Sequence, residues 1–308
     1  MGDFALSAEA SALVVRAAGI DVARYVFADD APAFEGPKPY LHPVRSLSGA
    51  PLTGFRPWDH RWHRGLQVTL TDVSGQNFWG GDTYVHGRGY LPLDNVGRIR
   101  HDRFTTTSDG EEAVVEEELT WITRAGEAWL GERRALRFHT LDEERGLWAL
   151  DVVTTLRGTG DRELVLGSPT TNGREDAGYS GVFLRLPRSF SGGTVTVPEA
   201  AGAVARTGAA ADAVMGAEAP WLAFAGLHDE VDGGGTVLAF AGRSSGHPAV
   251  RWFVRSEPIP VLAPSPTFAE TIALRPGDEL SLAHRFVFLD RVRETDELVA
   301  LADELAPC

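Results

Sequence analysis

Three of the nine histidines fall close together in the first quarter of the chain, in a segment rich in tryptophan and arginine. They are His42, His60 and His63, and Asp59 directly precedes the second of them. Imidazole exchanges protons near neutral pH, so histidine is the side chain most often used in general acid–base catalysis. We expect His63 or His60 to act as the acid of such a reaction, with Asp59 orienting one of the two rings.

The same segment offers the groups that recognise a sugar. Flat aromatic faces suit the C–H face of a pyranose ring, and polar side chains at the edge of a pocket bind hydroxyl groups. Trp79 is the expected stacking residue, and a small carbohydrate is the expected ligand. Contacts to hydroxyls or to a carboxylate are expected from Lys38, His42, Arg64, Asn77, Arg134, Asn172 and His247.

A second polar cluster runs from Ser168 to Tyr179, between a strand that ends near Leu166 and another that begins near Gly181. Loops on a rigid strand scaffold often carry sites, so Glu175 is the expected carboxylate partner of the histidines. An ordinary solvated turn would have the same composition.

Glu132 and Arg134 share one face of a predicted strand with apolar residues. Charges on such a face are costly unless they are paired. The two side chains therefore either form an ion pair with each other or lie on a face that opens into a groove.

A metal site is an alternative interpretation of the histidine segment. If a divalent ion is bound, its ligands would be His42, His60 and His63. The spacing of the last two is short and common, and no cysteine stands nearby, so we expect neither a metal nor another cofactor.

The bulk composition limits the class of partner. The 308 residues carry a formal net charge of −14, which disfavours nucleic acid and anionic membrane surfaces as partners. No stretch approaches the roughly 20 apolar residues of a membrane span, and the first twenty residues lack a signal-peptide pattern. Cys308 is the single cysteine, so no internal disulfide forms. We expect a cytoplasmic protein.

Alternation of apolar and polar residues, with a period of two, dominates the chain and predicts β-strands. It is clearest in residues 147–156 and 280–288. Apolar residues spaced by three and four predict one helix at about 292–306. The Gly36–Gly65 and Glu199–Ala219 regions are expected to be long loops. We predict an all-β protein, a large antiparallel β-sandwich with a C-terminal helix, formed as a single domain from residues 1–308.

Several motifs resemble a bacterial family of unknown function, DUF6807, often called the PmoA or methane oxygenase PmoA-like family. Its label implies a membrane-bound monooxygenase, which the lack of an apolar span argues against. The family is similar to the galactose-mutarotase-like supersandwich, which implies a concave sheet with a sugar pocket. In mutarotases a histidine protonates the ring oxygen and a glutamate accepts the anomeric proton. The matching motifs are Lys38–Arg45, Asp59–Gly65, Asp72–Gly80, Leu166–Arg174, Gly246–Arg255 and Leu274–Leu280, and the possible glutamates are Glu257 and Glu270.

These observations favour a carbohydrate-active enzyme of sugar catabolism, of the epimerase, lyase or hydrolase type. Histidine and carboxylate groups would carry acid–base catalysis on a sugar or an oxidised sugar. Two alternatives remain open: a non-catalytic sugar-binding or regulatory module, and a metal-dependent enzyme that uses the histidine cluster.

Overall fold

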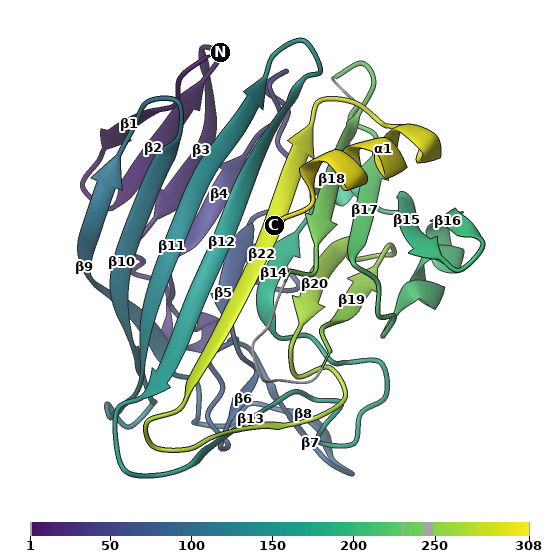
Figure 1. Cartoon of the computed structure of the whole chain (residues 1–308). Coiled ribbons are helices and arrows are strands. Elements are labelled where there is room, and N and C mark those ends of the chain that lie inside the picture. Colours follow the sequence, from purple (N-terminus) through teal and green to yellow (C-terminus); the bar gives the residue numbers. More distant parts are fainter. Residues whose placement is uncertain (1, 230, 243–248, 308) are drawn as a thin grey trace.

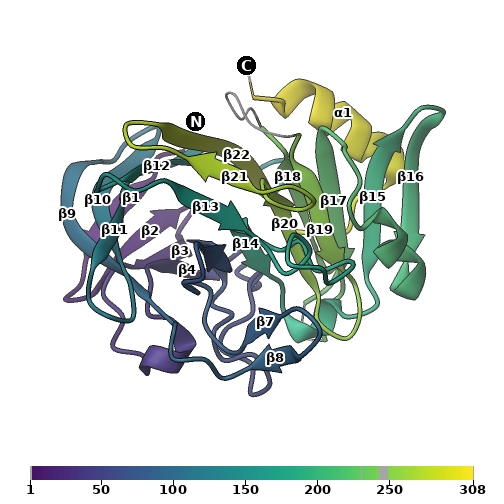
Figure 2. The ribbon, with the colours of Figure 1, turned by 90° about the horizontal axis from the view of Figure 1, so that it is seen from below.

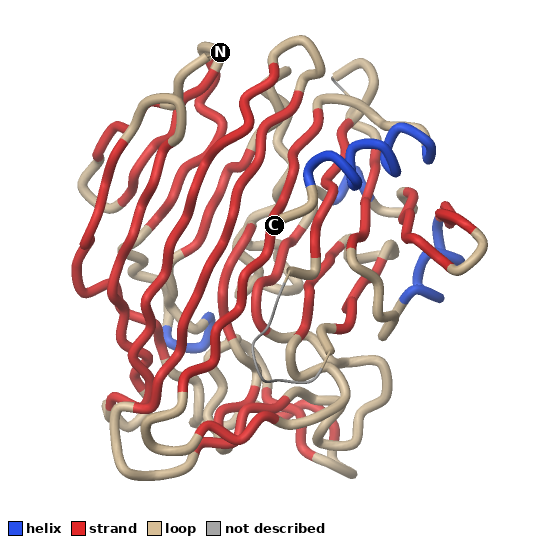
Figure 3. The backbone as a smooth tube through the Cα atoms, viewed as in Figure 1, coloured by secondary structure: helices blue, strands red, loops and turns tan. Residues whose placement is uncertain are grey.

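The computed structural model describes residues 2–229, 231–242 and 249–307. Two large antiparallel sheets pack face to face, which confirms the predicted all-β sandwich (Figures 1 and 3). The smaller of the two has eight strands, in the spatial order β1 (Ala5–Ala8), β2 (Ala12–Ala17), β3 (Ile20–Val26), β4 (Tyr40–Val44), β5 (Leu66–Thr69), β14 (Gly181–Arg185), β20 (Val261–Ser265) and β19 (Arg251–Arg255).

The larger sheet has nine strands and includes the longest strands of the protein. Their spatial order is β16 (Gly202–Thr207), β15 (Thr194–Glu199), β17 (Trp221–Gly226), β18 (Gly235–Phe240), β22 (Glu279–Leu289), β12 (Leu147–Gly158), β11 (Ala128–Asp142), β10 (Ala113–Ile122) and β9 (Arg98–Ser108).

Two small sheets lie at one end of the sandwich (Figure 1). One contains β21 (Ile272–Leu274), β13 (Leu164–Gly167) and β6 (Asp72–Val73), and the other pairs β7 (Thr83–Val85) with β8 (Gly89–Leu91). Seen from that end, the two large sheets curve around the core (Figure 2). Three short 3-10 turns occupy Ala33–Glu35, Arg188–Phe190 and Gly208–Val214.

The alternation seen in the sequence decides which face of each strand enters the core. Successive side chains of a strand point to opposite faces, so every second residue meets the facing sheet. The register pairs Trp148 of β12 with Phe288 of β22 and Leu150 with Phe286, and all four side chains are buried in the central cluster. The two predicted strands are therefore confirmed as neighbours that share a buried face.

The predicted C-terminal helix is confirmed as α1 (Thr295–Leu305). Its buried residues are Leu298, Leu301, Ala302 and Leu305, which pack on the face of the nine-stranded sheet turned away from the core (Figure 1). The described residues include no helix that is both long and apolar enough to cross a membrane.

Two loop predictions are wrong. The Glu199–Ala219 region contains β16 and a 3-10 turn, because its small residues pair with β15 at the edge of the larger sheet. The Gly36–Gly65 region includes β4, which pairs with both β3 and β5. The part of this region that carries His60 and His63 is, as predicted, a loop.

Candidate functional site

A pocket lies on the face of the eight-stranded sheet that points away from the core. On β14, Val182 and Leu184 enter the central cluster, whereas Phe183 between them belongs to a separate aromatic cluster outside. The same alternation places Phe253 of β19 and Val261 of β20 on that outer face. Three neighbouring strands thus form an apolar floor.

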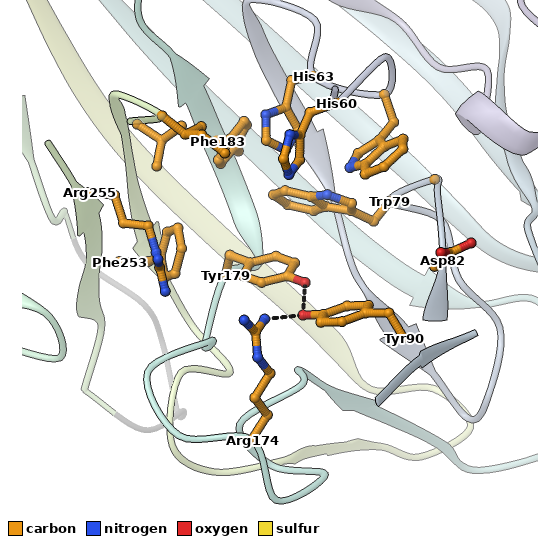
Figure 4. Close-up of a pocket in the computed structure, with 14 residues that line it drawn as sticks. His60, His63, Trp79, Asp82, Tyr90, Arg174, Tyr179, Phe183, Phe253 and Arg255 are labelled. Carbon is orange, nitrogen blue, oxygen red and sulfur yellow. Dashed lines mark hydrogen bonds between the residues drawn. The ribbon is translucent and has the colours of Figure 1, made fainter. Parts of the chain in front are cut away.

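Loops from the end of the sandwich build walls on this floor and enclose a cavity of about 370 Å³ (Figure 4). The volume is near the lower end of the range for small-molecule pockets, which run from about 300 to 1,000 Å³. The lining combines aromatic rings, two imidazoles and two guanidinium groups. Its residues are His60, Trp62, His63, Trp79, Gly80, Asp82, Tyr90, Arg174, Tyr179, Phe183, Phe253, Arg255, Ile259 and Val261.

The two imidazoles lie side by side at one end of this pocket (Figure 4). The ring centroids of His60 and His63 are 4.9 Å apart, and the His63 ring meets the Trp79 ring edge-on at 5.9 Å. Nδ1 of His60 lies 3.3 Å from a carboxylate oxygen of Asp59, whose other oxygen pairs with Arg188. Of the two rings, it is therefore His60 that lies next to the carboxylate of Asp59.

Both imidazoles are uncharged at neutral pH. Burial lowers the pKa of His63 well below its usual value, and the nearby charges of His60, Arg185 and Lys38 lower it further. Burial also lowers the pKa of His60, although Asp59 opposes that shift. An uncharged imidazole accepts a proton rather than supplying one, so these pKa shifts favour a base role over the expected acid role.

Trp79 is held in place by its backbone. Its N–H and the N–H of Gly80 both donate to the side-chain oxygen of Asn77, at 2.8 and 2.9 Å. Its carbonyl oxygen accepts a hydrogen bond from the ammonium group of Lys38 at 2.9 Å. Lys38 and Asn77 are buried and do not line the main cavity, although Asn77 lines a smaller adjoining hollow, and their polar groups hold the backbone of Trp79.

The position of the Trp62 ring depends on the lack of a side chain at Gly81. Gly81 adopts a φ of +70°, and a Cβ added there would lie 2.7 Å from the ring of Trp62. The absence of a side chain therefore lets the Trp62 ring lie against the backbone at the edge of the pocket.

Arg64, expected to bind the ligand, is buried in an ion-pair network outside the pocket lining. Its guanidinium pairs with Asp29 and, at 2.8 Å, with Glu35, which also pairs with Arg56 at 2.5 Å. Burial alone would raise the pKa of Glu35, but the two arginines hold it below its usual value. Because Glu35 also accepts a bond from Lys38 at its backbone, this network supports the wall that carries Trp79.

Three other predicted residues do not line the main cavity, and a fourth falls outside the described residues. His42 stacks on Phe55, and its Nδ1 lies 2.9 Å from the hydroxyl of Thr53. Burial lowers the pKa of His42 to about 4. The three others are Glu175, which is exposed, Asn172, which is exposed beside a smaller adjoining hollow, and His247, which lies outside the described residues.

Arg134 belongs to a second buried network, between the two large sheets. Its Nε donates to Glu132 at 2.7 Å, which confirms the predicted ion pair. Glu132 also accepts hydrogen bonds from Trp121 at 2.7 Å and Thr154 at 2.8 Å, and Arg134 donates to the hydroxyl of Tyr25 at 3.2 Å. Arg134 is therefore placed away from the pocket, where it neutralises buried carboxylates.

The alternative metal set is not assembled. His42 lies apart from the pair formed by His60 and His63, and no three His, Cys, Asp or Glu side chains in the described part of the chain are grouped so that they could hold a metal ion.

The residues that the sequence predictions missed stand opposite the imidazoles. The hydroxyls of Tyr90 and Tyr179 are 2.7 Å apart, and Arg174 donates to Tyr90. Desolvation raises the pKa of Tyr179 well above its usual value, so this hydroxyl keeps its proton. Arg174 and Tyr179 stand in the polar loop from Ser168 to Tyr179, so that loop supplies site residues, although not Glu175.

Fold and pocket together define a β-sandwich protein with an aromatic small-molecule pocket on the outer face of one sheet. The chain belongs to DUF6807, described as a family of unknown function, which matches residues 12–303. No curated protein shows significant similarity to it.

Two solved structures illustrate its distant likenesses. The GH36 alpha-galactosidase AgaB from Geobacillus stearothermophilus is 12% identical with a TM-score of 0.49, over 93% of this chain and 41% of that chain. Heparan sulfate lyase HepC from Pedobacter heparinus is 8% identical with a TM-score of 0.38, over 92% and 34% respectively. The chain spans less than half the length of either protein.

Proposed function

We propose that the protein is a carbohydrate-active enzyme whose pocket binds one sugar unit and whose base is His60. The observation that carries this proposal is the grouping of two uncharged imidazoles above the ring of Trp79 in one cavity. The carboxylate of Asp59, 3.3 Å from Nδ1 of His60, favours the tautomer of His60 that carries its proton on Nδ1. In that tautomer Nε2 is free to accept a proton from the ligand.

The rest of the pocket provides for binding and for a proton donor. The face of Trp79 and the ring of Phe253 suit the apolar face of a pyranose, and His63 can hydrogen-bond a hydroxyl group without carrying a charge. The hydroxyl of Tyr179, which stays protonated, supplies a donor on the opposite side. An uncharged base and a protonated hydroxyl in one pocket serve epimerisation, elimination or hydrolysis.

The architecture fits the same proposal. We propose that the sandwich is of the galactose-mutarotase-like kind and that the chain forms a single domain, because one central cluster joins both large sheets. The glutamates considered as counterparts of a mutarotase base are not needed here, since His60 takes that role.

The test is an incubation of the purified protein with aldoses, their glycosides and oxidised sugars, followed by NMR. We expect one class of sugar to be converted and His60→Gln to reduce the rate by about a hundredfold or more. His228→Gln is the matched control, because burial also lowers the pKa of His228, but its ring packs at a tilt against Phe190, away from the pocket. Equal rates for the two variants would rule out His60 as the base.

A non-catalytic sugar-binding module is the second candidate, since its binding surface would have the same aromatic lining. It predicts saturable binding of a sugar to the unmodified protein with no product after prolonged incubation.

A further inference from the structure

The floor of the pocket carries positive charge at its edge. The strand register sets Arg185, Val261 and Arg255 in one row across β14, β20 and β19. Phe183 lies two residues before Arg185 on β14, and Phe253 lies two residues before Arg255 on β19. Side chains two apart in a strand share a face, so the phenylalanines and the arginines point to the same side of the sheet. Two guanidinium groups therefore flank an otherwise apolar floor.

A third guanidinium, that of Arg174, enters from the loop before β14 and lines the cavity together with Arg255. The charges of both residues act on the hydroxyl of Tyr179, whose pKa each of them lowers against the larger effect of desolvation. Figure 4 shows both guanidinium groups beside Tyr179, away from the two imidazoles. The two cations thus face one region of the pocket.

Neither cation is neutralised by a carboxylate in the described part of the chain. Arg174 donates to the hydroxyl of Tyr90, and Arg255 donates to the backbone carbonyl of Asp176 at 3.4 Å. Arg251, on the same strand as Arg255, shows the contrast, because it pairs with Glu218 at 2.5 Å. Arg64 and Arg134, both buried, form such pairs as well, whereas among the described residues the two pocket arginines do not.

The electrostatic surroundings strengthen this contrast. Asp82 is the single acidic side chain among the described lining residues. Arg185, buried next to the imidazoles, also lacks an acceptor at Nε and Nη1. A cationic pocket on a protein of net charge −14 concentrates anionic ligands at the pocket and repels them elsewhere.

We infer that the ligand is an acidic sugar, a monosaccharide unit whose carboxylate is bound by Arg174 and Arg255 while Trp79 packs on its ring. This inference rests on the proposed function and names its substrate class. Guanidinium groups match the planar geometry of a carboxylate. Phosphate sites commonly add backbone N–H groups from a helix or a loop, whereas aromatic side chains form the walls here.

The test compares by calorimetry the affinities of three classes of probe: the acidic sugars methyl glucuronide and methyl galacturonide, their neutral glycosides, and the sugar phosphate glucose 6-phosphate. We expect a uronide to bind at least about tenfold more tightly than its neutral counterpart, with a smaller difference at high salt. Arg174→Gln and Arg255→Gln should each weaken uronide binding about tenfold or more and leave neutral glycosides unaffected. Arg251→Gln, which makes the same change in net charge, should leave both affinities unchanged.

The possible outcomes separate the inference from the proposal beneath it. If neutral and acidic sugars bind with equal affinity, and the two arginine variants do not change it, the inference of an acidic sugar is overturned. The proposal that the pocket binds a sugar would then still hold. Preference for the sugar phosphate would overturn the assignment of a carboxylate. No binding of any probe would overturn the proposed function as well.

Discussion

The ammonium group of Lys38 lies 2.9 Å from the backbone carbonyl oxygen of Trp79, inside the wall of the pocket. Lys38 is fully buried, and this burial, together with the charge of Arg64, lowers its pKa from 10.5 to about 7. The residue that fixes the stacking tryptophan therefore titrates near neutral pH in the folded protein.

This relationship predicts how stability depends on pH. Between pH 7 and 10 the unfolded chain holds a proton on Lys38 that the folded protein has lost, so folded-state stability rises with pH in this window. The gain is lost progressively as the pH falls from 10 to 7, and below pH 7 Lys38 no longer makes the stability depend on pH. Relative to Lys38→Met, the unmodified protein should gain up to about 5 kcal/mol between pH 7 and 10.5, at about 1.4 kcal/mol per pKa unit. Urea unfolding at several pH values measures the difference, and a pH-independent difference would contradict the prediction.

Alanine substitutions at two glycines can distinguish the cost of backbone strain from the effect of displacing the Trp62 ring. Gly81 and Gly87 have φ values of +70° and +71°, but an added Cβ meets the Trp62 ring only at Gly81 and nothing within 4 Å at Gly87. Both alanine substitutions should cost about 1–3 kcal/mol for the left-handed backbone. Only Gly81→Ala should also shift tryptophan fluorescence and weaken sugar binding. Equal effects of the two substitutions on binding would show that Trp62 has no part in it.

The network between the sheets predicts a large loss of stability without a loss of binding. Arg134→Met leaves Glu132 buried without its cation and should destabilise the fold by about 3–5 kcal/mol. Arg133→Met, at the next position, removes an exposed pair with Glu279 and should cost less than about 1 kcal/mol. Urea unfolding compares the variants. If Arg134→Met stays as stable as Arg133→Met and loses sugar affinity, Arg134 contacts the ligand after all.

The proposed base can be tested through its own titration. Asp59 raises the pKa of His60, so Asp59→Asn should lower that pKa further. In the unmodified protein, burial lowers the pKa of His63 well below its usual value, so its ring should titrate at a lower pH than the ring of His60. NMR of labelled histidine rings reports both values, with Asp82→Asn as a control that leaves His60 unchanged. A rise in the His60 pKa on loss of Asp59 would remove the basis for its role.

Much of the fold could be predicted from the sequence because the spacing of apolar residues along a strand or helix determines which of its faces is buried. The alternation in residues 147–156 and 280–288 fixes which side chains are buried whatever strand lies opposite, and the spacing of Leu298, Leu301 and Leu305 fixes the buried face of α1. The prediction of a loop at 199–219 was wrong because the small residues there show no strand pattern in the sequence. They form a strand only because β15 lies beside them and pairs with them.

For the site, the sequence by itself determined where reactive groups are dense: the loop with His60 and His63, Trp79, and the loop that ends at Tyr179. It did not determine which groups meet. That choice belongs to the tertiary structure, which places His42, Arg64 and Arg134 outside the pocket lining and buries the two arginines in ion-pair networks.

The tertiary structure also brings Arg255 from the far edge of the sheet to face Arg174. The two residues are distant in sequence, and no short-range pattern links them. The pairing of β14, β20 and β19 places Arg255 on the face that the loop with Arg174 also borders, and burial on this face lowers the pKa of both imidazoles. Residue types and spacing thus indicated which segments carry reactive side chains. Strand order and burial decided which of these side chains line the pocket and whether they are charged.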